Sequence, residues 1–135
     1  MYQRVVVPLD GSPVAEGILP FILEIAAPLD LAVVLLRVED VPASMAEAEV
    51  YLAGVAGRLR ARGVRVETLV RGGEAAGEIL AGARAAGADL IAMTTHGRTG
   101  LGRLLFGSIA EAVLRRADIP VFLMRLEEAP WQRTA

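Results

Sequence analysis

The chain has 135 residues, of which 54% are hydrophobic, and a formal net charge of −2. This length suits a single domain whose core needs no disulfide or metal to hold it together. The sequence contains no cysteine, which excludes disulfides, thiolate metal sites and thiol catalysis, and its single histidine argues against a zinc site. All 14 basic residues are arginine, so a lysine Schiff base and a P-loop lysine are excluded as well.

The charge balance and the hydropathy pattern bear on partners and location. A slightly acidic chain with three Phe, two Tyr and one Trp lacks the basic patch and the stacking platform of a nucleic-acid-binding surface. The opening residues lack the layout of a signal peptide, and the most apolar window, residues 18–38, is interrupted by prolines and charges. We therefore expect a soluble, cytoplasmic protein that binds neither nucleic acid nor membrane.

The first third of the chain predicts a strand, a helix and a second strand. Residues 4–7 form a short β-branched run. Ser12-Pro13 offers an N-cap followed by proline at the first helical position, and Pro28 marks the end of that helix. A continuous apolar run begins at residue 31 and ends with Arg37 and Val38, which is typical of a strand buried on both faces of a parallel sheet.

The middle of the chain predicts a second helix and a half-exposed strand. The capping-box pattern Ser44-Met-Ala-Glu47 starts the helix, which runs to about Arg62 and is closed by Gly63. Alternating apolar residues at 64–70 predict a strand at a sheet edge, although Leu69 breaks the alternation.

The last part predicts two more helix–strand units. After Gly72-Gly73 a third helix places Ile79, Leu80 and Ala83 on its inner side. The remaining predictions are a fourth strand at 90–93, a fourth helix opened by the capping box Ser108-Ile-Ala-Glu111, a fifth strand from Pro120 to Met124 and a C-terminal tail at 127–135.

Five strands alternating with four helices predict right-handed βαβ units, hence one domain with a three-layer α/β/α sandwich around a parallel sheet. In such doubly wound sheets, ligands bind outside the carboxyl ends of the strands, where the winding direction reverses. The loops after the first and fourth strands and the end of the second strand would all lie at this edge. We expect them to form one crevice.

A glycine-rich loop between the fourth strand and the fourth helix carries the strongest functional signal. It comprises the thirteen residues 95–107, four of them glycine, and precedes a helix start at Ser108. Glycines let the backbone approach a ligand, and a helix N-terminus presents N–H groups to phosphate oxygens. The Gly102-x4-Gly107 spacing is that of a Walker A loop, but Ser108 stands where that motif needs lysine, and no dinucleotide fingerprint is present.

The stretch from Thr94 to Ser108, TTHGRTGLGRLLFGS, closely resembles the nucleotide loop of the universal stress protein family. The ATP-binding members of that family carry G-x2-G-x9-G-[ST], and Gly97, nine further residues and Gly107-Ser108 match its later part. The resemblance also covers PLDGSP at 8–13, LLRV at 35–38, ADLI at 88–91 and Pro120-Val121, so it spans essentially the whole chain.

This resemblance implies a universal stress protein domain at residues 1–126, with strand order 3-2-1-4-5 as in adenine-nucleotide alpha-hydrolase-like folds. It also implies ATP as the ligand, accompanied by Mg²⁺ or Mn²⁺. Phosphates would meet backbone N–H groups at Gly97, Gly107, Ser108 and Ile109, together with the Ser108 hydroxyl. The full set of implied ATP-binding residues is Pro8, Leu9, Asp10, Val38, Met93, Thr94, His96, Gly97, Arg98, Gly107, Ser108 and Ile109.

Several of these residues also have a purely structural interpretation. By resemblance, Asp10 lies near the ribose or a metal-bound water, the Val38 backbone contacts the adenine edge and Met93 lies beneath the sugar. Asp10 can equally cap a turn, and Val38 and Met93 can be core residues. Ser108 can act as an N-cap that accepts from the Glu111 N–H.

Three positions in the loop or directly before it leave alternatives open. Thr94 stands where the family pattern begins with glycine, so its β-branched side chain either narrows the pocket or donates its hydroxyl to the nucleotide. His96 has no paired nucleophile and is interpreted as a positioning or surface residue. Arg98 either clamps phosphate or belongs to a solvated loop face.

Three functions remain in competition. The first is an ATP-binding module for signalling or stress resistance, with at most weak ATPase activity because the chain lacks an evident base and a phosphate lysine. The second is a slow nucleotide hydrolase or phosphotransferase assisted by Asp10 or His96. The third is a dimeric scaffold that binds no nucleotide because Thr94 closes the pocket. In every case the apolar strand from Pro120 to Met124 predicts a homodimer, as the resemblance also implies.

Overall fold

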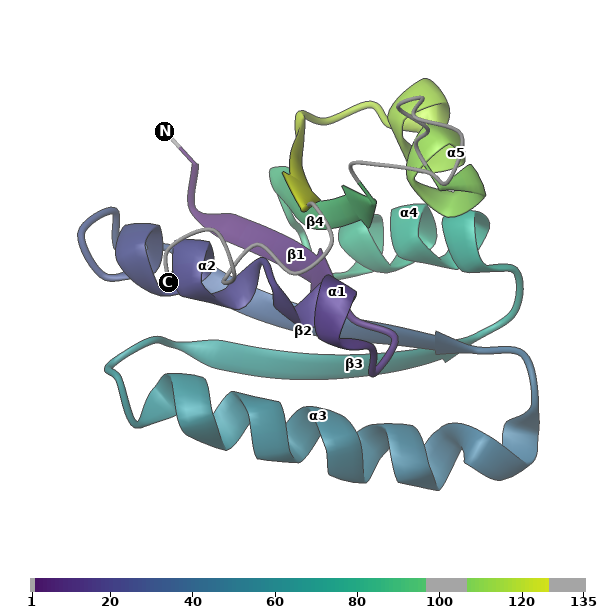
Figure 1. The fold of residues 1–135 in the computed structure, drawn as a ribbon, viewed down its shortest axis with the longest axis horizontal. Helices are drawn as coiled ribbons and strands as arrows, with labels where there is room; N and C mark the ends of the chain where they lie inside the picture. Colours follow the sequence, from purple (N-terminus) through teal and green to yellow (C-terminus); the bar gives the residue numbers. More distant parts are fainter. Residues whose placement is uncertain (1, 97–106, 127–135) are drawn as a thin grey trace.

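The structure, a computed structural model, describes residues 2–96 and 107–126 (Figure 1). Five parallel strands form one sheet in the order β3-β2-β1-β4-β5, as predicted. The strands are β1 (Arg4–Pro8), β2 (Ala32–Glu39), β3 (Val66–Gly72), β4 (Leu90–His96) and β5 (Val121–Leu126). The helices are α1 (Pro13–Glu16), α2 (Leu19–Ala26), the 3-10 turn η1 (Pro42–Ser44), α3 (Met45–Arg60), α4 (Ala75–Ala85) and α5 (Ser108–Arg116).

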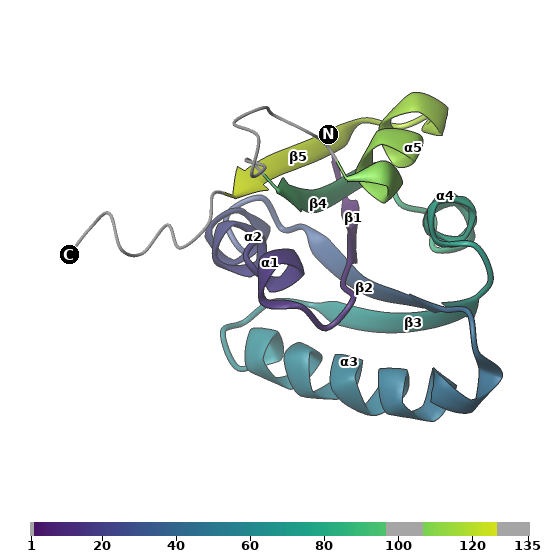
Figure 2. The ribbon, with the colours of Figure 1, turned by 45° about the vertical axis from the view of Figure 1, so that its right-hand side comes forward.

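Helices cover both faces of the sheet and confirm the three-layer α/β/α sandwich (Figure 2). One core cluster joins the sheet to α2 and α3, and a second joins it to α4 and α5. Among the described residues, no helix is long and apolar enough to cross a bilayer.

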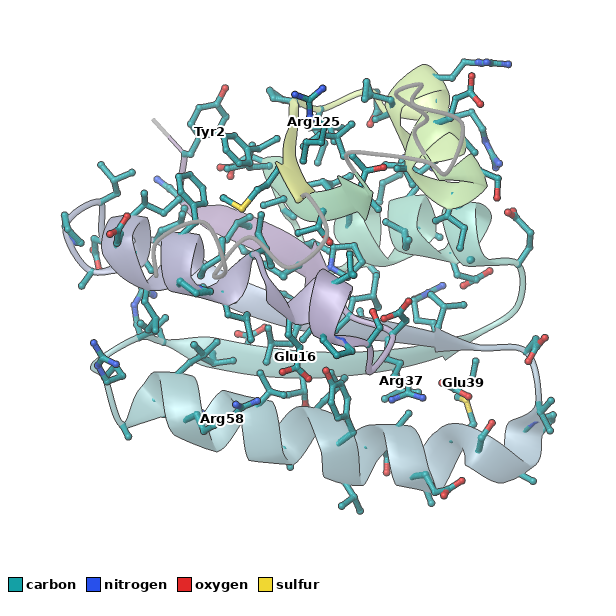
Figure 3. The ribbon with its side chains drawn as sticks, in the orientation of Figure 1. Tyr2, Glu16, Arg37, Glu39, Arg58 and Arg125 are labelled. Atoms are coloured by element: carbon teal, nitrogen blue, oxygen red, sulfur yellow. The ribbon has the colours of Figure 1, made fainter. Side chains whose placement is uncertain are left out.

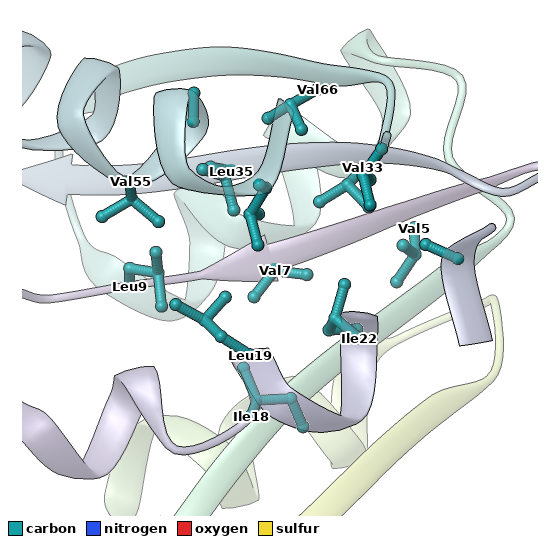
Figure 4. Close-up of a cluster of buried hydrophobic side chains, with 14 of the residues drawn as sticks. Val5, Val7, Leu9, Ile18, Leu19, Ile22, Val33, Leu35, Val55 and Val66 are labelled. Carbon is teal, nitrogen blue, oxygen red and sulfur yellow. The ribbon is translucent and has the colours of Figure 1, made fainter. Parts of the chain in front are cut away.

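The centre of the sheet is buried on both sides because successive strand residues point to opposite faces. Val5 and Val7 of β1 belong to the cluster on the α3 side (Figure 4), whereas Val6 belongs to the cluster under α4 and α5. In β2, residues 32–36 are all buried. This confirms that the uninterrupted apolar run forms a doubly covered strand.

The first predicted helix is two helices in the structure. Ser12 caps α1 by accepting a 3.1 Å hydrogen bond from the Ala15 N–H, and Pro13 opens the helix, both as predicted. The helix nevertheless ends at Glu16, and α2 begins at Leu19. Pro20 lies in the first turn of α2, where its missing N–H costs nothing, so it starts a new helix instead of continuing the old one.

The predicted starts of both helices are confirmed, with Ser44 as the N-cap of α3, but neither predicted capping box forms. The Ser44 hydroxyl donates to the Val41 carbonyl at 2.8 Å, because η1 precedes α3 and turns the side chain backward. Helix α5 begins at Ser108 as predicted, but its N-cap is Gly107, which has no side chain to offer. The side-chain cap that the sequence analysis missed is Glu74, whose carboxylate accepts from the N–H groups at the start of α4.

The sheet edges agree with the sequence pattern, with shifted boundaries. Strand β3 lies at one edge, as its half-exposed pattern predicted, and Leu69 packs under the α4 side instead of facing solvent. Strand β4 continues three residues past the predicted end at Met93, to His96, and the last strand is Val121–Leu126 instead of 120–124. The predicted tail at 127–135 lies outside the described residues.

Two neighbouring positions of α3 test the assignment of its inner face. Leu52 is fully buried in the core, whereas Val50 is 74% exposed. We expect Leu52→Ala to lower the free energy of unfolding by about 2–5 kcal/mol, because the cavity adds to the lost apolar burial. Val50→Ala should change it by less than about 0.5 kcal/mol. Urea denaturation followed by circular dichroism measures both, and equal effects would contradict the assignment.

Candidate functional site

A pocket of about 450 Å³ opens at the carboxyl ends of β1, β2 and β4, where the loop after β1 meets the start of α5. Its size falls within the roughly 300–1,000 Å³ that small-molecule sites occupy. Apolar side chains make up most of the lining, with a few polar groups among them. The predicted site residues that line it are Pro8, Leu9, Asp10, Val38, Met93, Thr94, Gly107, Ser108 and Ile109.

The pocket also contains residues that the sequence analysis missed. Some directly follow a predicted residue in the sequence, as Thr95 follows Thr94, and this position next to a site residue could have predicted them. Ala75 and Ile79 had no such signal, because α4 reaches the pocket only by packing beside α5. The missed lining residues are Ser12, Val14, Ala15, Leu36, Ala75, Ile79, Thr95 and Ala110.

The loop after β1 is a tight turn built around Asp10. The Asp10 Oδ1 atom accepts from the Ser12 N–H at 2.9 Å, and the intervening Gly11 has φ +89°, in the left-handed region that favours glycine. The predicted turn-capping role of Asp10 is therefore present, and the same residue lines the pocket. The Asp10 carboxylate therefore both stabilises the turn and faces the pocket.

Two adjacent threonines at the end of β4 form hydrogen bonds to the two sides of the pocket, one to α1 and one to the start of α5. The Thr94 hydroxyl donates to the Val14 carbonyl in α1 at 2.9 Å. The Thr95 hydroxyl, on a side chain that is 5% exposed, accepts from the Gly107 N–H at 3.1 Å. Because neighbours along a strand point to opposite sides, one pair of residues can hold α1 and α5 at once.

Among the described residues, the N-terminus of α5 offers backbone hydrogen-bond donors to the pocket. The N–H groups of the first turn of a helix have no partner within the helix, and Ser108 and Ile109 occupy that turn here. Gly107, predicted to donate to phosphate, already donates to Thr95. Ser108 and Ile109 are therefore the positions best placed to receive an anion.

The N-terminus of α4 also borders the pocket, through Ala75. It differs from that of α5 because a carboxylate of the chain, Glu74, already caps it. The Glu74 carboxylate accepts from the Gly77 N–H at 2.9 Å and the Ala76 N–H at 3.0 Å. These backbone bonds hold the pKa of Glu74 below its usual value, and Arg116 adds to the effect. An acidic ligand would meet repulsion here and attraction at α5.

The remaining predicted residues and the metal can be placed only in part. The His96 side chain, Gly97 and Arg98 lie outside the described residues. Within residues 2–96 and 107–126, no three His, Asp or Glu side chains come together as a metal site, and Asp10 is the one carboxylate in the pocket lining. The described residues therefore do not fit a resident metal held by protein alone, but they fit a divalent ion that arrives with phosphate oxygens.

The sequence profile of the Universal stress protein family matches residues 1–125 of the chain. The chain belongs to this family. A universal stress protein of Methanocaldococcus jannaschii is 33% identical over 141 residues, which cover 93% of this chain and 83% of that protein. The resemblance inferred from the glycine loop is thus confirmed.

Solved structures of other universal stress proteins share the fold. One, determined in complex with cAMP, has a TM-score of 0.74 and 27% identity and covers 92% of this chain and 97% of its own. The universal stress protein from Archaeoglobus fulgidus in complex with dAMP has a TM-score of 0.70 and 25% identity, covering 90% and 97% of the two chains. These two relatives bind adenine nucleotides.

In this universal stress protein, the departure from the family pattern at Thr94 has a definite structural role. A hydroxyl has a single proton, and that of Thr94 is directed to the Val14 carbonyl. Of the two alternatives that the sequence left open, donation to a nucleotide is thus in competition with an existing bond. The side chain fastens the wall of the pocket formed by α1.

Substitution of Gly11 tests the geometry of the Asp10 turn, with Gly57 as a comparison. The left-handed backbone at position 11 is strained for any residue with a Cβ atom, and that atom would lie 3.1 Å from Nη1 of Arg37. We expect Gly11→Ala to destabilise the fold by about 1–2 kcal/mol. Gly57→Ala, in an open position on α3, should stabilise it by about 1 kcal/mol, since alanine is the better helix former. Thermal unfolding of both variants provides the comparison, and a neutral Gly11→Ala would refute the strained-turn assignment.

Proposed function

We propose that this universal stress protein binds ATP, accompanied by Mg²⁺ or Mn²⁺, and uses occupancy of the pocket as a signal in stress resistance. The observation that carries the proposal is the joining of an apolar pocket to the N-terminus of α5. Adenine is a flat, largely apolar group, and its phosphates are anions. The pocket offers a surface for each.

The adenosine end of the site would lie against β1 and β2. The side chain of Val38 is partly buried against the core, so its backbone is the part that can contact the base edge, in line with the interpretation as a core side chain. Met93 is 7% exposed and borders the same pocket. Asp10 supplies the carboxylate that a ribose hydroxyl can donate to. The cAMP and dAMP complexes of the two relatives support an adenine nucleotide as the ligand.

The phosphate end of the site would lie at α5. Ser108 and Ile109 would donate backbone N–H groups, and the Ser108 hydroxyl adds another donor. If phosphate also takes the Gly107 N–H, the bond to Thr95 must open. The divalent ion would be held chiefly by phosphate oxygens, with Asp10 contributing through a water molecule.

We propose at most weak hydrolysis of the bound nucleotide. Efficient phosphoryl transfer needs positioned charge around the transferring group. The sequence contains no lysine, and Asp10 is the one carboxylate that lines the pocket among the described residues. A binding module therefore fits these residues better than a dedicated enzyme.

Isothermal titration with ATP and Mg²⁺ tests the proposal. We expect saturable binding in the wild type and an affinity about tenfold lower in Asp10→Ala, since a hydrogen bond to a charged group contributes roughly 1.5–3 kcal/mol. Asp118→Ala is the matched control because Asp118 does not line the pocket and, among the described residues, its ion pair is with an exposed arginine, Arg84, at 3.4 Å. Its affinity should equal that of the wild type. Absence of heat at millimolar ATP, together with no copurified nucleotide on denaturation, would sink the proposal.

We also propose that the protein forms a homodimer through β5. This strand lies at the edge of the sheet, and none of the other described strands pairs with its outer side, where a second chain would add. Phe122 is 38% exposed although its ring stacks on Phe21 with centroids 4.5 Å apart, so apolar surface remains along the edge.

The oligomeric state is measured by size exclusion with light scattering. We expect a mass twice that of the 14.3 kDa chain, unchanged on dilution through the micromolar range, because pairing of β5 removes both an open sheet edge and apolar surface from water. A mass equal to that of one chain at all concentrations would contradict the homodimer.

A further inference from the structure

The turn that carries Asp10 is supported from the face of the sheet opposite the pocket. Val38 faces the α4 side, so its neighbour Arg37 points to the α3 side. There the Arg37 guanidinium lies directly against Gly11, within 3.1–3.9 Å of the position that a Cβ atom would take. Glycine at position 11 thus permits both the left-handed turn and the close approach of Arg37.

The Arg37 side chain is itself fixed by two neighbours. Its Nε donates to the Glu39 carboxylate at 2.6 Å (Figure 3). Its guanidinium carbon lies 5.1 Å from the centre of the Tyr51 ring in α3. A guanidinium at this distance from an aromatic face is attracted to it. Arg37 is 23% exposed and Glu39 13%, so solvent screens their attraction only in part.

The far end of the same segment is tied to α3 as well. The Tyr51 hydroxyl donates to the Glu16 carboxylate, and Arg58 approaches the other oxygen of Glu16 at 3.5 Å. Burial and the bond to Glu16 raise the pKa of Tyr51, so the hydroxyl stays protonated and remains a donor. One aromatic side chain therefore connects Gly11, through Arg37, with Glu16.

We propose that Arg37 and Tyr51 are positioning residues of the nucleotide site. Acting from the α3 face, they hold residues 10–16 in the conformation that presents Asp10 to the ligand. Neither residue lines the pocket. The inference rests on the proposed nucleotide binding, and it adds that affinity depends on an arginine–tyrosine pair across the sheet from the ligand.

The test compares variants that remove one contact each. Arg37→Met keeps the apolar stem and removes the guanidinium, and Tyr51→Phe keeps the ring and removes the bond to Glu16. The control is Arg71→Met, because Arg71 pairs with Glu78 at 2.8 Å, has a similar exposure of 30% and does not line the pocket. If Arg37→Met does not fold, Arg37→Gln serves in its place, because it also removes the guanidinium, and the same loss of affinity is expected.

The first measurement is the affinity for ATP with Mg²⁺ by titration calorimetry. We expect at least fivefold weaker binding in Arg37→Met, a smaller loss in Tyr51→Phe and a change under twofold in Arg71→Met. In an Asp10→Ala background the effect of Arg37→Met should fall below twofold, because Arg37 acts through Asp10. Wild-type affinity in Arg37→Met, or an undiminished effect without Asp10, would overturn the inference.

The second measurement needs no ligand. Amide hydrogen exchange at Ser12 and Ala15, whose N–H groups bond within the segment, should be at least fivefold faster in Arg37→Met than in wild type or Arg71→Met. Exchange at Val6 in the central strand should be unchanged. Unaltered exchange at Ser12 and Ala15 overturns the positioning role. If the wild type binds no nucleotide, the proposed function fails, and the exchange data still decide whether Arg37 holds the segment.

Discussion

Strand β1 is the element on which the rest of the structure depends. It is hydrogen-bonded to β2 on one side and to β4 on the other, and Val5, Val6 and Val7 are fully buried. From β1 the chain winds outward to β2 and β3, and later returns to the other side for β4 and β5. Helices following the two directions lie on opposite faces, and at the carboxyl end of β1 they leave an opening between α1 and α5. The pocket occupies that opening.

The backbone groups around this opening determine what the pocket can bind. Strand and helix ends leave N–H and carbonyl groups that require partners. Several find them in short polar side chains: Thr94 serves the Val14 carbonyl, Thr95 the Gly107 N–H, and Asp10 the Ser12 N–H. The start of α5 has no side-chain cap among the described residues, whereas Glu74 caps α4. The pocket therefore favours an anion at one defined end.

Membership of the universal stress protein family establishes the fold and makes adenine nucleotides the natural ligands to consider. The chain's own residues set the terms on which a nucleotide would bind. Thr94 replaces a glycine of the family pattern, and its hydroxyl donates to the Val14 carbonyl in α1. The Gly107 N–H already donates to Thr95. On the opposite face, Arg37 and Tyr51 brace the Asp10 turn. Affinity in this protein would thus reflect both faces of the sheet.

The sequence by itself determined the strands, which of them are buried and which lies at the sheet edge, and most of the pocket lining. Apolar runs and glycine positions express local preferences, and the parallel sheet brings the ends of β1, β2 and β4 together once those preferences are known. The break between α1 and α2 after Glu16 and the reversed hydroxyl of Ser44 escaped prediction, because each depends on how the chain enters the next helix. Only the tertiary structure decided that α4 lines the pocket, that Thr95 takes the Gly107 N–H and that Arg37 lies against Gly11. These contacts join residues far apart in sequence, and their geometry follows from packing, which no local pattern encodes.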